Sequence, residues 1–232
     1  MAEIRAENDG ERNLIKNNTL AWLITLVATS KLIVLYEFLA KSSYEGFTTA
    51  STAHKERRQA HNLAVETLRE ALGTVHEAVR ELFMHTQMKH GAAGLDKLES
   101  LLGGITRSDL AKLSRNEVAT RVGGLLTAID TGFSLKLNTE MVEALRAAHA
   151  ALVTGQQQEA MTRAQRKQSH EALVLARAAF DRDSVRFART VEDDPEASGL
   201  VIDLGAYRRA RKDGGEGEDE SDDATDLSAI SI

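Results

Sequence analysis

A single proline, Pro195, is the feature that most constrains how these 232 residues can fold. Proline interrupts helices because it has no backbone N–H and its ring clashes with the preceding turn. The 194 residues before Pro195 are therefore free to form long helices. The aromatic content of 4% and the abundance of Ala, Leu, Glu and Arg disfavour a large sheet. The sequence predicts an all-α fold.

Glycines mark the expected breaks between helices. Residues 41–90 contain few breakers and read as one helix, which the glycine-containing segment HGAAG at 90–94 should interrupt. A short amphipathic helix is expected over 95–102, closed by the glycines at 103–104. Ser108 is the expected N-cap of the next helix, which continues to residue 130.

After a turn at 131–138, Asn138 or Thr139 is expected to cap a long last helix that reaches about Thr190. Most steps between its apolar residues are three, four or seven, so they form one stripe. A helix of ~50 residues at ~1.5 Å each would be ~75 Å long. We therefore predict a long antiparallel helical bundle over residues 41–190. The residues expected to pack it are Leu145, Leu152, Leu173, Phe180 and Phe187.

The charge of −6 is concentrated at one end of the chain. Residues 213–232 hold eight Asp and Glu and no Lys or Arg, so residues 1–212 alone carry +2. A segment this acidic and this rich in Gly and Ser is expected to be a disordered tail. It argues against a nucleic-acid partner. The expected order is a polar segment at 1–16, an apolar segment at 17–40, the bundle, a closing segment at 191–212 and the tail.

Residues 17–40, NNTLAWLITLVATSKLIVLYEFLA, are the most apolar part of the chain. The 22 residues of the segment 14–35 match the ~20 that a helix needs to cross a bilayer. We therefore expect a transmembrane helix, with a buried or interfacial helix as the alternative. The acidic residues at the start of the chain disfavour a cleaved signal peptide. The expected membrane-anchoring residues are Leu20, Trp22, Leu23, Ile24, Leu26, Val27, Leu32 and Ile33.

Lys31 is the objection to a transmembrane helix. A lysine at the bilayer centre costs about 2.5–3.5 kcal/mol, although near a helix end its stem can reach the headgroups. Lys and Arg slightly favour the side after the apolar segment, which indicates that the bundle of this expected single-pass membrane protein is cytoplasmic.

Catalytic motifs are missing from the sequence. It contains no phosphate-binding glycine loop, no His-Glu-x-x-His and no nucleophile elbow. Glu77, Glu81 and His85 share one helix face and are weak candidates for a metal site. A solvated helix face explains the same spacing, and a closed site would need ligands from a second helix. We expect no enzyme activity and no cofactor.

Several stretches resemble the LemA family, which combines an N-terminal membrane span with a bundle of long helices. NLAVETLREA at 62–71 resembles its first long helix, and VGGLLTAIDTGFSLKLNTEMVEAL at 122–145 resembles its middle signature. RAAFDRDSVRFA at 177–188 resembles the end of its last helix, and PEASGLVIDLGAY at 195–207 its closing segment. LFMHTQMKHG at 82–91 is most similar to the magnetosome branch of the family.

The resemblance covers about residues 20–207, with departures. Phe180-Asp181 and Phe187-Ala188 stand where the family has Tyr-Asn pairs, and of these only Asp181 can still accept a hydrogen bond through its side chain. The resemblance implies a membrane-anchored bundle that organises a membrane, in the magnetosome branch the magnetosome membrane. Its partners would be the lipid membrane, other membrane or organelle-building proteins, and further copies of the chain. The alternative is a soluble coiled-coil assembly protein, a virion or secretion component, with residues 17–40 buried in an oligomer.

Overall fold

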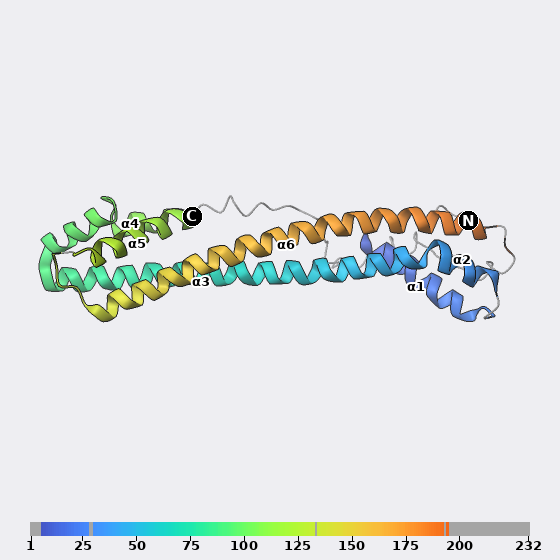
Figure 1. Ribbon diagram of the computed structural model, residues 1–232, viewed down its shortest axis with the longest axis horizontal. Coiled ribbons are helices and arrows are strands. Elements are labelled where there is room, and N and C mark those ends of the chain that lie inside the picture. Colours follow the sequence, from blue (N-terminus) through green and yellow to red (C-terminus); the bar gives the residue numbers. More distant parts are fainter. Residues whose placement is uncertain (1–5, 28–29, 133, 193, 195–232) are drawn as a thin grey trace, which may run out of the picture. The chain divides into compact units, whose positions relative to one another are not determined.

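The structure is a computed structural model that describes residues 6–27, 30–132, 134–192 and 194. These residues form helices and contain no strand (Figure 1). The prediction of an all-α fold is confirmed. The helices are α1 (Asp9–Thr25), α2 (Lys31–Leu39), α3 (Lys41–Leu101), α4 (Arg107–Leu110), α5 (Arg115–Asp130) and α6 (Thr139–Val191).

The described residues divide into two compact units. Unit 1 contains residues 6–57 and 166–194, and unit 2 contains residues 58–165. The long helices α3 and α6 contribute to both units. Each unit has its own cluster of buried apolar side chains. Most of the closing segment 191–212 and the whole acidic tail 213–232 lie outside the described residues.

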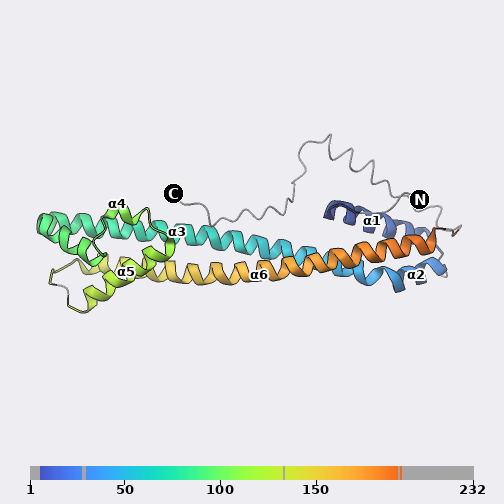
Figure 2. The same ribbon diagram turned by 90° about the horizontal axis from the view of Figure 1, so that it is seen from above.

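In unit 2, the helices α4 and α5 lie beside α3 and the first part of α6 (Figure 2). Val75, Val79 and Leu82 are fully buried on α3, and their spacing of four and three residues places them on one helix face. Gly155 of α6 lies against Leu68 of α3, where an added Cβ would be 3.5 Å from the Leu68 Cα. The glycine therefore lets the two helices approach closely.

The helix that we expected over 108–130 is instead two helices. Thr106, not Ser108, caps the short α4, because its side chain accepts a hydrogen bond from the Asp109 backbone N–H. Ser114 then begins α5 with a capping box, in which its side chain and that of Glu117 each bond the other's backbone N–H. The expected cap at the start of α6 is confirmed for Asn138, whose side chain accepts hydrogen bonds from the backbone N–H groups of Glu140 and Met141.

A kink at Gly91 interrupts α3 where the HGAAG segment predicts a break. Gly91 has φ 64° and ψ −161°, a region of backbone space that is essentially restricted to glycine. The helix resumes after the kink and ends at Leu101. The expected break is therefore confirmed as one sharply bent residue rather than as a loop.

Replacing Gly91 by alanine should lower the free energy of unfolding by about 1–3 kcal/mol, because the Cβ would be strained at this φ and ψ. Gly73 is the matched control in the same helix. An added Cβ at Gly73 has open space around it, so Gly73→Ala should stabilise the protein by about 0.5–1 kcal/mol. Urea denaturation followed by circular dichroism measures both. Effects of the same sign would contradict this account of the kink.

In unit 1, α1, α2 and the first turns of α3 lie beside the C-terminal part of α6 (Figures 1 and 2). Their contact is built on aromatic side chains. Tyr44 stacks on Phe180 at a centroid distance of 4.5 Å, and Tyr36 meets Phe187 edge to face at 6.0 Å. Phe47 also contacts Phe180. Ser184 donates a hydrogen bond to the Tyr44 hydroxyl, and burial raises the pKa of Tyr44.

The prediction of one uninterrupted helix over 17–40 is wrong. The helix α1 ends at Thr25, whose hydroxyl donates to the Trp22 carbonyl. Ser30 caps α2, because its side chain accepts a hydrogen bond from the Leu32 backbone N–H. Lys31 is consequently the first residue of α2 and not a residue in the middle of a long helix.

No helix among the described residues combines the length and the apolar character that crossing a bilayer requires.

Candidate interaction surface

The eight expected anchor residues fall into three classes of exposure. Trp22, Leu23 and Leu32 are buried in the apolar cluster of unit 1. Leu26 and Ile33 are half-buried against the same cluster. The remaining three, Leu20, Ile24 and Val27, are exposed. Three of the eight expected anchor residues therefore pack against their own chain.

Five exposed apolar side chains lie on α1, on α2 and between the two helices: Leu20, Ile24, Val27, Val34 and Phe38. Ile24 is 84% exposed and Phe38 is 81% exposed. Leu20 and Ile24 are four residues apart on α1, and Val34 and Phe38 are four apart on α2, so each pair occupies one side of its helix. We call these five residues the α1–α2 apolar surface.

Two cations beside this surface have carboxylate partners. Lys31 forms an ion pair with Asp194 at 2.6 Å, and Lys41 bonds both carboxylate oxygens of Glu37 at 2.7 and 2.8 Å. These pairs hold the charge near the apolar surface close to neutral. The pairing of Lys31 also offsets the unfavourable position of a cation in the first turn of a helix.

Partly buried ion pairs fasten α1 to α6. Arg12 is buried and donates to both oxygens of Asp181, at 3.0 and 2.7 Å. Asp9 accepts a hydrogen bond from Arg12 at 3.1 Å. It also accepts two hydrogen bonds from Arg177, one on each carboxylate oxygen, both at 2.7 Å. Asp181 thus accepts hydrogen bonds from a residue of another helix. These two-pronged arginine–carboxylate pairs fix both distance and orientation.

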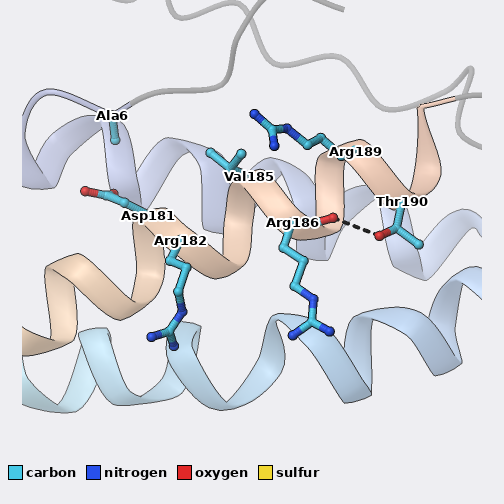
Figure 3. A pocket seen from close by; sticks show the side chains of 7 residues that line it. All are labelled: Ala6, Asp181, Arg182, Val185, Arg186, Arg189 and Thr190. Atoms are coloured by element: carbon cyan, nitrogen blue, oxygen red, sulfur yellow. Dashed lines mark hydrogen bonds between the residues drawn. The ribbon is translucent and has the colours of Figure 1, made fainter.

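A cavity of about 630 Å³ lies along α6 near its C-terminal end. Arginines border it on both flanks: in Figure 3, Arg182 and Arg186 extend to one side of α6, and Arg189 and Val185 to the side on which Ala6 lies. We call this cavity the arginine groove. It is lined by Ala6, Asp181, Arg182, Val185, Arg186, Arg189 and Thr190.

Positive charge dominates the arginine groove. Asp181 is engaged by Arg12, and Asp183 beside the groove is engaged by Arg182 at 2.8 Å. Among the described residues, Arg186 and Arg189 have no carboxylate partner. Sequence reasoning missed this groove, although a signal exists, since steps of four and three residues place the three arginines near one another on a helix.

A second cavity, of about 450 Å³, lies in unit 2 between the end of α3 and α5. Its charged side chains already have structural roles. Arg121 donates to the carbonyl oxygens of Leu102 and Gly103. Hydrogen bonds from Ser114 lower the pKa of Glu117, which completes the capping box. These contacts use the cavity's cation and carboxylate to close helix ends.

The weak metal candidates do not converge on a site. Glu77 and Glu81 are exposed on α3, and Arg80 pairs with Glu77 at 3.3 Å. No group of three or more potential metal-ligating residues comes together in the described part of the chain.

His76 is a half-buried titratable side chain on α3 in unit 2. Burial lowers its pKa, and its Nε2 has no hydrogen-bond partner among the described residues. The unfolded chain, where a histidine pKa is about 6.5, then binds more protons than the folded chain as the pH falls from about 7 to 5. The free energy of unfolding should therefore decrease over this range. Urea titrations should show a shallower decrease for His76→Leu, and equal slopes would contradict the assignment.

Comparison of the chain with protein-family models, with curated proteins and with solved structures gives no match.

Proposed function

We propose that this protein is a non-enzymatic helical bundle that attaches to the surface of a lipid membrane through the α1–α2 apolar surface. The observation that carries the proposal is the exposure of Ile24 and Phe38, at 84% and 81%. Exposed apolar side chains that gather in one region mark sites that bind a membrane or another protein. The long helices would then present partner-binding surfaces beside that membrane. The resemblance to the LemA family is compatible with this role, and its magnetosome branch would make the membrane that of the magnetosome.

The contacts on α1 and α2 support attachment in a specific way. Trp22, Leu23 and Leu32 hold the two helices on the body of unit 1, so the exposed residues project from a fixed base. Lys31 and Lys41 are paired with carboxylates, which leaves burial of apolar area as the main driving force. Attachment should therefore depend little on anionic lipid.

Vesicle sedimentation of the full chain with neutral phosphatidylcholine tests this proposal. Burying a large apolar side chain is worth about 1.5–3 kcal/mol. Replacing both Ile24 and Phe38 by glutamine should therefore weaken partitioning into vesicles by about a hundredfold or more. The control variant carries the same replacement by glutamine at Leu63 and Met88, which are exposed on α3 in unit 2. It should bind vesicles as well as the unmodified protein. If the two double variants bind equally well, membrane attachment through α1 and α2 is wrong.

Self-assembly is the second candidate function, because a copy of the chain could cover the same exposed residues. An oligomer would not have to bury the whole 17–40 segment, because Trp22, Leu23 and Leu32 are already buried within one chain. Light scattering separates the two candidates. A discrete oligomer that dissociates in the Ile24→Gln, Phe38→Gln variant, without vesicle binding by either protein, would favour assembly.

A further inference from the structure

The geometry points to the arginine groove as a docking site for an acidic segment, and we propose that residues 213–232 of this chain are its occupant. This inference is independent of the proposed membrane attachment, because it concerns α6 and not the α1–α2 apolar surface. It gives a role to the strongest charge asymmetry in the sequence.

The groove has the charge that an acidic segment needs. Arg186 and Arg189 have no carboxylate partner in the described part of the chain, and both line the cavity. Arginine binds carboxylates through two parallel N–H···O bonds, which makes it well suited to this contact. Arg182 extends to the same side of α6 as Arg186 (Figure 3). It pairs with Asp183 in an exposed contact, which a carboxylate of the acidic segment could replace.

The sequence 213–232 has the complementary charge. It holds eight Asp and Glu and no Lys or Arg, whereas residues 1–212 carry +2. The preceding stretch YRRARK, at 207–212, has four basic residues. These could pair with half of the eight acidic residues, so about four negative charges remain for another site. The unpartnered arginines of the groove match that excess in sign.

The segment can reach the groove from where the described chain ends. Asp194 follows the end of α6, and Arg182 lies nine residues before Val191, a helix distance of about 14 Å. A chain of 19 residues, the separation of Asp194 and Asp213, has a root-mean-square length of about 24 Å. This length exceeds the distance to be covered, so the segment can reach the groove at an effective concentration of about millimolar.

The test uses the full chain, whose lack of cysteine makes one introduced thiol a unique labelling position. A spin label on Ser221→Cys should broaden the backbone amide signals of residues 182–190 in nuclear magnetic resonance spectra. The broadening should be lost at about 1 M salt, where the Debye length is about 3 Å. It should also be lost in a variant with Arg182, Arg186 and Arg189 replaced by glutamine.

The matched control replaces three exposed arginines of unit 2, Arg69, Arg80 and Arg107, by glutamine. It changes the net charge equally and should leave the broadening intact. The docking proposal is overturned if the amides of 182–190 are not broadened, or if both triple variants lose the effect equally. Broadening that appears only when labelled chains are mixed with unlabelled ones would show the tail of a second copy, and would overturn docking within one chain.

A second variant tests the same contact without changing α6, in case the arginine-to-glutamine protein misfolds. Replacing Asp219, Glu220, Asp222 and Asp223 by their amides leaves every described residue unchanged. It should reduce the broadening as strongly as loss of the arginines. Undiminished broadening in this variant would show that the contact is not made by the carboxylates, and would overturn the proposed chemistry.

Discussion

Phe180→Ala should lower the free energy of unfolding of unit 1 by about 3–5 kcal/mol, the usual loss for a buried phenylalanine. Phe180 is fully buried. Its ring centroid lies 4.5 Å from that of Tyr44 and 5.2 Å from that of Phe47. Removal of the ring leaves a cavity between α3 and α6 that these two rings can fill only by leaving their own contacts. The loss therefore combines the transfer of the ring to water with the cost of the cavity.

Leu175→Ala is the matched control on the same helix. Leu175 is 73% exposed, so its truncation should change stability by no more than about 0.5 kcal/mol. Hydrogen exchange provides the local readout, because the amides of α6 beyond Arg166 report on unit 1 and those around Leu145 on unit 2. Equal effects of the two substitutions would show that the aromatic contacts do not stabilise unit 1.

Helix content and core-facing stripes could be predicted from the sequence because both follow from local rules. A chain with one proline has few positions where a helix must end. Leu145, Leu152, Leu173, Phe180 and Phe187 share a helical stripe, and the structure buries all five. A period of 3.6 residues specifies which face of a helix is apolar, whatever covers that face.

What covers an apolar face could not be predicted, and the error over 17–40 shows why. Trp22 and Leu32 are removed from water by Tyr36, Tyr44 and other residues of the same cluster, and lipid would remove them from water equally well. The break between α1 and α2 did have a local signal. Ser30 before Lys31 is a suitable N-cap, but hydroxyl residues are also tolerated in membrane helices, so this local signal alone does not distinguish the two structures.

The candidate sites depend on pairs of residues that are far apart in the sequence. Arg12 and Asp181 are separated by 169 residues, and no spacing rule connects them. The arginine groove is an intermediate case. The spacing of Arg182, Arg186 and Arg189 is visible in the sequence, but the cavity and the missing carboxylate partners are properties of the folded chain.

Asp9→Ala should destabilise unit 1 by about 3 kcal/mol, because it removes one partner from a buried ionic cluster. Asp9 accepts hydrogen bonds from both Arg12 and Arg177, and only 10% of the Arg12 side chain is exposed. Arg177 would lose its contact with α1, and Arg12 would keep only Asp181. Hydrogen exchange should accelerate throughout α1. Glu77→Ala removes an exposed pair with Arg80 and should cost no more than about 1 kcal/mol.

A double variant decides whether the loss comes from an uncompensated buried charge. If it does, adding Arg177→Met to Asp9→Ala should restore part of the stability, because Arg177 donates to both oxygens of Asp9 and an apolar side chain of similar length needs no partner in that position. If the loss comes only from the missing tie between α1 and α6, the double variant should be no more stable than Asp9→Ala. The first result would mean that these ions select how α1 docks on α6 without adding net stability. The α1–α2 apolar surface would then depend on them for its position, and apolar packing around Trp22 would supply its stability.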